Sequence, residues 1–274
     1  MEILKKKNNL ILIIISVFFI SCNTNSSRID KLIEKANVLY SEKEYEQVIK
    51  NDNEIIKLNP QLHQIYFQRS LSKYNTEDLK GALEDINNAI NIKKEGEYFY
   101  HKARFFEKMN KIDSAIAYYT LAVKLDSNLY EAFNNRGLLY KSNRKYQLAL
   151  TDFNKALELD PNNSILYNNR ATLYQELENQ EKAIEDFTKA IKINELSYYY
   201  RSRAASYAFI NKFNKALSDL NKAIELDPSN SMAFNDRGLL NNISGDRVKA
   251  CSDWKKAEEL GSTEARYYIN KFCL

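Results

Sequence analysis

The stretch Tyr130–Pro161, YEAFNNRGLLYKSNRKYQLALTDFNKALELDP, decides the fold. Apolar residues recur in it at helical spacing, through Tyr140 in the first half and Phe153 in the second. Small residues, such as Gly137, stand where two helices must approach closely, and Asp160-Pro161 ends the second run. The stretch therefore predicts two amphipathic helices. Neither can bury its apolar face alone, so the unit needs copies of itself.

The chain supplies these copies. The first small residue of the second helix recurs every 33 or 34 residues, at Val48, Ala82, Ala115, Ala149, Ala183, Ala216 and Ala250. The small position of the first helix recurs in step, at Ala36, Ser70, Ala103, Gly137, Ala171, Ala204 and Gly238. Only six Gly and three Pro occur among the 274 residues, which favours nearly continuous helix.

With this period and these positions, the chain resembles the tetratricopeptide-repeat family from about Ile29 to Leu260. The resemblance implies an all-α solenoid over 29–274, with about seven helix-turn-helix repeats and a C-terminal capping helix at 262–272. The expected repeats lie near 29–61, 62–95, 96–128, 129–162, 163–195, 196–229 and 230–261. Repeat one departs from the pattern, since Asp52 stands where later copies have a large apolar residue, and we interpret it as a degenerate N-terminal cap.

The N-terminus has the pattern of a secretory signal over residues 1–21. Lys5-Lys6-Lys7 precede the apolar run Leu10–Ile20, whose eleven residues are too few to span a bilayer. Phe19-Ile20-Ser21-Cys22 resembles a bacterial lipobox, which implies cleavage before Cys22 and acylation of that cysteine, with palmitate among the chains. Residues 22–28 are expected to be a lipid-anchored tether. An ordinary secretory peptide or an uncleaved anchor is the alternative.

This resemblance implies a lipoprotein of the bacterial cell envelope, and we expect it on the outer membrane, facing the periplasm. In an oxidising compartment the remaining cysteines, Cys251 and Cys273, form an even pair and predict a disulfide. Two buried thiols are the alternative. Glu258 in the seventh repeat replaces an apolar residue that faces the next repeat in earlier copies, so it marks the end of the stack.

A charge ladder recurs with the repeats. An arginine precedes the small residue of the first helix, and an aspartate follows it sixteen residues later. The pairs are Arg69 and Asp85, Arg136 and Asp152, Arg170 and Asp186, Arg203 and Asp219, and Arg237 and Asp253. Repeat three lacks both members, with Lys102 and Tyr118. This joint loss indicates pairing, within or between repeats, and favours a structural ladder over ligand capture.

Family resemblance places partner binding on the concave groove lined by the first helices. The residues expected there are polar, and they are Asn134, Lys141, Asn168, Gln175, Arg201, Asn235 and Asn242. Amide side chains can both donate to and accept from a peptide backbone or a glycan. A merely solvated helix face is the alternative.

Little in the sequence indicates catalysis. His63 and His101 lie on different repeats, and there is no phosphate-binding loop and no metal-ligand spacing. The net charge of +4 is spread over mixed charges and gives no footprint for nucleic acid. We therefore expect no cofactor, no metal and no enzyme activity. The sequence predicts an envelope scaffold or adaptor that binds a protein partner, and a module capturing peptide or glycan is the alternative.

Overall fold

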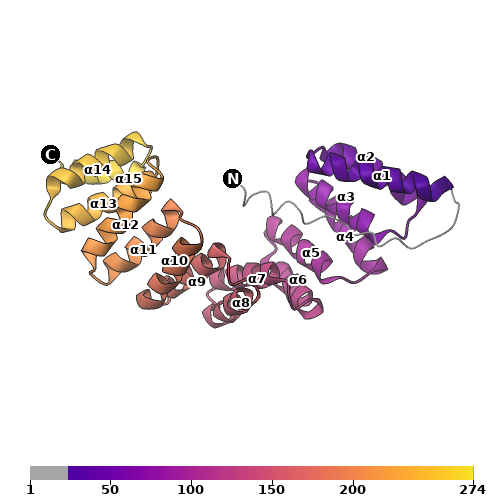
Figure 1. Cartoon of the computed structure of the whole chain (residues 1–274), viewed down its shortest axis with the longest axis horizontal. Helices are drawn as coiled ribbons and strands as arrows, with labels where there is room; N and C mark the ends of the chain where they lie inside the picture. Colours follow the sequence, from indigo (N-terminus) through magenta and orange to yellow (C-terminus); the bar gives the residue numbers. More distant parts are fainter. Residues whose placement is uncertain (1–23, 274) are drawn as a thin grey trace. The chain divides into compact units, whose positions relative to one another are not determined.

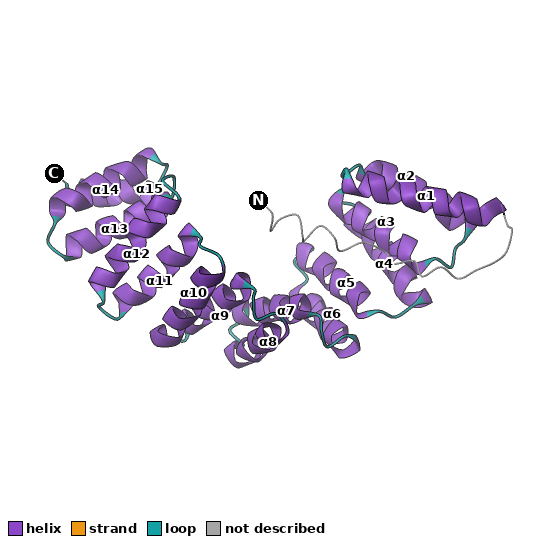
Figure 2. Ribbon diagram, in the orientation of Figure 1, coloured by secondary structure: helices purple, strands orange, loops and turns teal. Residues whose placement is uncertain are grey.

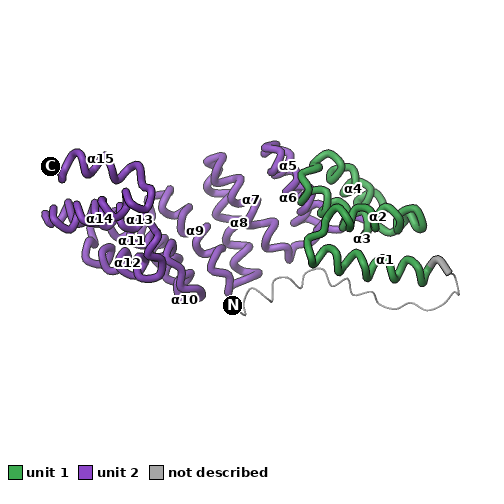
Figure 3. The backbone as a smooth tube through the Cα atoms, turned by 90° about the horizontal axis from the view of Figure 1, so that it is seen from above, with its two compact units in different colours: residues 1–92 green, residues 93–274 purple. Residues whose placement is uncertain are grey.

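The structure is a computed structural model that describes residues 24–273, and all the regular structure in that range is helical (Figure 2). The chain divides into two compact units, residues 1–92 and 93–274 (Figure 3). Within each unit every odd-numbered helix up to α13 packs against the even-numbered helix that follows it, and α15 packs against α14, as Figure 1 shows. The predicted all-α fold of tandem helix pairs is confirmed.

The first unit consists of two helix pairs. Its helices are α1 (Thr24–Ser41), α2 (Tyr45–Leu58), α3 (His63–Asn75) and α4 (Leu79–Ile92). Ala36 of α1 and Val48 of α2 are fully buried, as are Ala82 and Ile86 of α4. Asp52 of α2 is also fully buried, in the place that Ile86 takes in the second pair. The first pair thus carries a carboxyl group inside its core.

The second unit consists of five helix pairs and a final helix. Its helices are α5 (Gly96–Lys108), α6 (Ile112–Leu125), α7 (Tyr130–Ser142), α8 (Tyr146–Leu159), α9 (Ser164–Glu176), α10 (Gln180–Ile193), α11 (Ser197–Phe209), α12 (Phe213–Leu226), α13 (Ser231–Ile243), α14 (Arg247–Glu259) and α15 (Thr263–Phe272). The small residues let the paired helices touch. A Cβ atom on Gly238 would lie 2.6 Å from Nε1 of Trp254, which is fully buried, so only glycine fits opposite this ring.

The turn inside each repeat contains one residue with positive φ, two positions after the last residue of the first helix. Six of these residues are not glycine, with φ between 56° and 66°, and they are Lys43, Glu77, Asn110, Arg144, Glu178 and Asn211. Only the seventh repeat has the residue best suited to this conformation, Gly245 at φ 84°. Every repeat therefore has a left-handed residue in this turn, even where that residue is not glycine.

The helical region begins earlier than the sequence indicates. Residues 22–28 are expected to be a tether, and α1 begins within that range, at Thr24. Extending an existing helix costs far less than starting one, so polar residues next to a packed helix can join it. The predicted signal over 1–21 and the acylated Cys22 lie outside the described residues. No helix within residues 24–273 has the length and apolar character needed to cross a membrane.

Candidate functional site

The arginines and aspartates of the charge ladder form bidentate ion pairs within each repeat. Nε and Nη2 of Arg136 each donate to a different carboxylate oxygen of Asp152, both at 2.8 Å. The same two-bond geometry joins Arg69 to Asp85, Arg170 to Asp186, Arg203 to Asp219, and Arg237 to Asp253. Sequence alone left open whether such pairs lie within or between repeats, and here each links the two helices of one repeat.

The third nitrogen of each guanidinium extends the ladder to the preceding repeat. Nη1 of Arg136 donates to Thr120 Oγ1 at 3.0 Å, and Nη1 of Arg170 donates to Asn154 Oδ1 at 2.7 Å. Equivalent bonds join Arg69 to Asn53, Arg203 to Thr188, and Arg237 to Asn221. Each arginine therefore ties together its own two helices and the second helix of the repeat before.

Aromatic rings enclose most of these guanidinium groups. The Cζ atom of Arg170 lies 5.9 Å from the ring centroids of both Tyr167 and Tyr174, one turn away on either side along α9. Such cation–π contacts add to the ion pair. Burial lowers the pKa of Arg170, but the hydrogen bond and charge of Asp186 raise it above its ordinary value. The ladder is a saturated structural feature and offers no vacant charge to a ligand.

In repeat three, Lys102 and Tyr118 take the places of the arginine and the aspartate of the charge ladder. The ring of Tyr118 stacks on Phe106, with 5.2 Å between centroids and 3° between planes, and it also stacks on Phe99 at 6.4 Å. Nζ of Lys102 lies 4.2 Å from the Tyr118 ring centroid. An aromatic ring thus occupies the place of the guanidinium between the two flanking rings. A cation–π contact replaces the ion pair, which explains why both ladder residues change together.

We call the seven residues expected to bind a partner the first-helix face. They lie on α7, α9, α11 and α13, and six of them are half-buried, while Asn235 is only 4% exposed. Most of them contact the first helix of the next repeat. The hydrogen bonds are Asn169 to Asn134 (2.8 Å), Lys141 to Thr172 (3.2 Å), Gln175 to Ser206 (2.8 Å) and Arg201 to Asp236 (2.7 Å). The sequence did not reveal these cross-repeat bonds, although their separations of 31 or 35 residues bracket the repeat length.

Some hydrogen-bonding capacity on this face remains unused. Gln175 donates through Nε2 to the carbonyl of Ser202 and the hydroxyl of Ser206, while its Oε1 accepts no hydrogen bond from the described residues. Asn168 donates to Asn169 at 3.5 Å, and its Oδ1 likewise accepts none within residues 24–273. Asn168 and Gln175 lie seven residues apart and so share one side of α9. Helix α9 therefore presents two amide oxygens that could accept hydrogen bonds from a ligand.

The end of the first-helix face at α13 is more tightly engaged. Nδ2 of Asn235 donates to Glu264 of α15 at 3.4 Å, and Asn235 Oδ1 is buried without a hydrogen-bond partner among the described residues. Burial raises the pKa of Asp236; nearby Arg201 opposes this effect, and Glu264 adds to it. Asn235 therefore serves the contact with the final helix and is poorly placed to reach a partner.

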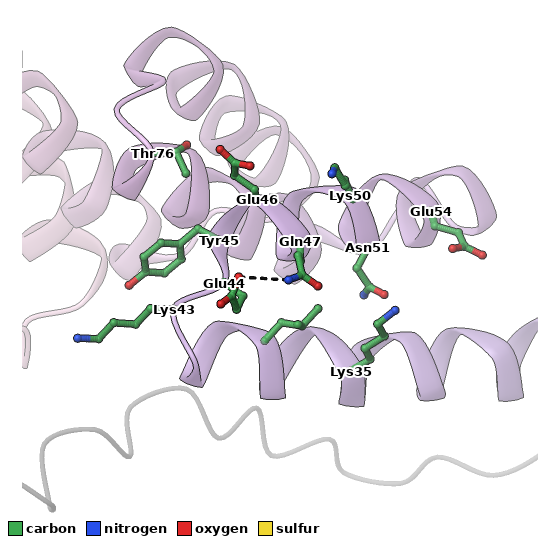
Figure 4. A pocket seen from close by; sticks show the side chains of 11 residues that line it. Lys35, Lys43, Glu44, Tyr45, Glu46, Gln47, Lys50, Asn51, Glu54 and Thr76 are labelled. Atoms are coloured by element: carbon green, nitrogen blue, oxygen red, sulfur yellow. Dashed lines mark hydrogen bonds between the residues drawn. The ribbon is translucent and has the colours of Figure 1, made fainter.

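A separate hollow of about 650 Å³ lies in the first unit, between α1 and α2 (Figure 4). Lys35 lines it from α1, while Gln47, Lys50 and Asn51 line it from α2. The side-chain amide of Asn51 already has a partner, because its Nδ2 donates a hydrogen bond to the carbonyl of Leu32 at 2.7 Å. Three lysines and three glutamates balance one another around the hollow, so its charge favours no class of ligand. Residues 24–273 also contain no group of His, Cys, Asp or Glu that could hold a metal ion.

Cys251 of α14 and Cys273, directly after α15, are joined by a disulfide with a Cα–Cα distance of 5.6 Å. Tyr268 and Phe272 of α15 stack against Trp254, at centroid distances of 5.2 and 5.7 Å. The final helix thus covers the apolar side of the seventh repeat by both aromatic packing and a covalent bond.

The tetratricopeptide-repeat family matches residues 96–129, 130–163, 153–185 and 198–230. A tetratricopeptide repeat protein from Parabacteroides merdae is 19% identical, with a TM-score of 0.63 over 90% of this chain and 99% of that chain. The C-terminal part of a repeat-containing protein from Cytophaga hutchinsonii is also 19% identical, with a TM-score of 0.71 over 85% and 97%.

A third similar structure is YrrB, described as a repeat protein of this class with an unusual peptide-binding site. It is 24% identical, with a TM-score of 0.59 over 69% of this chain and 99% of its own. At these identities the three structures establish the fold and nothing finer. The chain contains tetratricopeptide repeats, and its described part has the all-helical fold built from them.

Proposed function

We propose that this protein is a non-catalytic scaffold that binds an extended segment of a partner protein on the first-helix face. The observation that carries the proposal is the pair of half-buried amide oxygens on α9, at Asn168 and Gln175, that accept no hydrogen bond from the described residues. Such oxygens suit the N–H groups of an extended peptide. The repeat fold itself is typical of protein–protein interaction, and the peptide-binding site ascribed to YrrB supports this use.

The exposed Ala205 on α11 allows a direct test, because it lies on the same side of the first helices and takes part in no side-chain hydrogen bond. We expect Ala205→Trp to block the face and abolish partner capture from solubilised envelope, while leaving the helical circular dichroism unchanged. Ala117→Trp, on the exposed side of the second helix α6, is the matched control and should capture the partner normally. Equal capture by both variants would reject the first-helix face.

The proposal also includes a location, the bacterial cell envelope, with the chain held on a lipid bilayer through acylated Cys22. Its support is the order of the sequence, in which Lys5-Lys6-Lys7 and an apolar run of eleven residues precede Cys22. Cells grown with a clickable palmitate analogue should label the protein, and Cys22→Ser should abolish the label. Persistent labelling of Cys22→Ser would rule out this site of acylation.

Capture of a small peptide or a glycan is the second candidate. Tyr198, 43% exposed at the start of α11, supports it, because its ring packs against Tyr199 with 4.2 Å between centroids and could stack on a sugar or a side chain. Tyr198→Ala should weaken glycan or short-peptide binding under this candidate, and it should leave the capture of a protein segment largely unchanged under the first.

A further inference from the structure

One edge of the last two repeats carries exposed apolar side chains. It is formed where first helices end and second helices begin, together with the end of α15 (orange to yellow in Figure 1). We call it the basic edge, and it comprises residues 209–215, 243–249 and 271–273. Phe209 and Ile243, at equivalent positions of neighbouring repeats, are each 62% exposed, and Val248 is 84% exposed. Val248 lines one surface hollow with Phe272 and Cys273, so the second and third segments share one surface.

Cations surround these apolar side chains. The basic edge contains five of them against one carboxylate, Asp246, and the five are Lys212, Lys215, Arg247, Lys249 and Lys271. Nζ of Lys249 lies 2.7 Å from an Asp246 carboxylate oxygen. The other four cations are exposed and have no carboxylate partner among residues 24–273. The positive charge of this edge is therefore largely unneutralised.

The opposite edge of the same repeats provides the contrast. Residues 225–232 and 258–264 contain five carboxylates and no cation. Three of the carboxylates pair with cations from the adjoining helices, and these pairs are Glu225 with Lys222 (2.7 Å), Glu258 with Arg266 (2.7 Å) and Glu259 with Lys256 (3.0 Å). The opposite edge is therefore acidic with three of its five charges paired, whereas four of the five cations of the basic edge have no carboxylate partner among residues 24–273.

We propose that the basic edge binds the surface of an anionic phospholipid bilayer. Exposed Phe, Ile and Val side chains can enter the boundary between head groups and acyl chains, while lysines and arginines around them meet the lipid phosphates. The apolar residues project from helix ends, one or two in each repeat. They do not follow one helix at the three- and four-residue spacing that a partner helix would need. This geometry favours a bilayer over a protein segment. The inference depends neither on the first-helix face nor on Cys22.

Tryptophan quenching in the full-length protein tests the proposal locally. Ile243→Trp places a reporter on the basic edge, and Met232→Trp places one on the opposite edge, where Met232 is 56% exposed. Both variants are mixed with vesicles of equal parts phosphatidylglycerol and phosphatidylcholine with brominated acyl chains. The buried Trp254 gives the background, measured on the unsubstituted protein. We expect quenching at position 243 and none at 232, and loss of the quenching on phosphatidylcholine alone.

Charge removal completes the test. Lys212→Gln and Arg247→Gln in the Ile243→Trp protein should each weaken vesicle binding about fivefold, the effect of one cation at an anionic surface. Lys222→Gln, on α12 beside the opposite edge, should change it little. Equal quenching at both positions, or none at either, would overturn the proposal. The proposal would also be overturned if soluble polyglutamate, but not vesicles, shifted the fluorescence emission of the tryptophan at position 243. That result would assign the basic edge to an acidic protein partner.

Discussion

At the scale of single residues, Asp52 is the side chain that least fits its surroundings. It is fully buried, and neither carboxyl oxygen has a hydrogen-bond partner among the described residues. The equivalent positions hold large apolar side chains, such as Ile86 and Phe153, which are also fully buried. Burial raises the pKa of Asp52 to about 8; Arg69 opposes this shift, and Asp85 adds to it. The carboxyl group is therefore protonated in the folded chain at neutral pH.

This shift predicts how stability depends on pH. The folded chain keeps a proton that the unfolded chain releases above pH 3.8, so the contribution of Asp52 to stability is full below that pH. The contribution falls by up to about 1.4 kcal/mol per pH unit as the pH rises toward 8, and then levels off. We expect Asp52→Leu to remove this loss. The free energy of unfolding, measured with urea, should therefore fall less between pH 5 and 8 in Asp52→Leu than in the wild type. Asp52→Asn controls for charge alone. Parallel pH curves for the wild type and Asp52→Leu would contradict the assignment.

At the scale of the helical elements, the sequence predicted the all-α architecture of repeated helix pairs that the structure shows. Period, small positions and apolar positions all repeat, and each constrains the backbone of every copy. Hydrogen-bond partners were harder to predict. The bond from Asn169 to Asn134 and the contact between Lys102 and Tyr118 depend on side-chain rotamers across neighbouring elements, which no period encodes. The helical residues after Thr24 were missed because their polar composition is also that of a tether.

The left-handed turn residues give a prediction for the elements. Arg144 has φ 56°, a conformation that costs most residues about 1–2 kcal/mol and glycine almost nothing. We expect Arg144→Gly to increase the free energy of unfolding by about 0.5–1 kcal/mol, after the greater flexibility of glycine in the unfolded chain is counted. Gly245→Ala, at φ 84°, should lower it by a similar amount. Calorimetric unfolding measures both, and a loss of stability in Arg144→Gly would show that the arginine side chain contributes more than the turn costs.

The two versions of the ladder should be interchangeable as units. Arg136→Lys with Asp152→Tyr reproduces the pair Lys102 and Tyr118, between the rings of Phe133 and Tyr140. Each single change disturbs a buried ion pair, whereas the double change installs a complete cation–π contact. We expect the double variant to be more stable than the sum of the single effects by about 1–2 kcal/mol in a double-mutant cycle. The reverse exchange, Lys102→Arg with Tyr118→Asp, is the matched test, and additive effects in both repeats would contradict modular exchange.

At the scale of the whole molecule, the division into two units and the stacking of repeats limit how far a disturbance travels. Within each unit a repeat contacts mainly its neighbours, so each repeat is stabilised by local contacts. The second unit ends with α15, held over Trp254 by Tyr268 and Phe272 and by the disulfide between α14 and Cys273. The last repeat therefore depends on a covalent bond for part of its closure.

Removing that bond should loosen only the end of the stack. The disulfide closes a loop with a sequence separation of 22 residues, and a loop of this size contributes about 3 kcal/mol through the unfolded state. We expect Cys273→Ser to raise amide hydrogen exchange in α14 and α15, while exchange in α1 to α4 stays unchanged, because those helices share no repeat interface with the end. Treating the wild type with dithiothreitol should have the same effect, whereas the variant should not respond. Faster exchange in both units would instead show that the chain opens as one cooperative body.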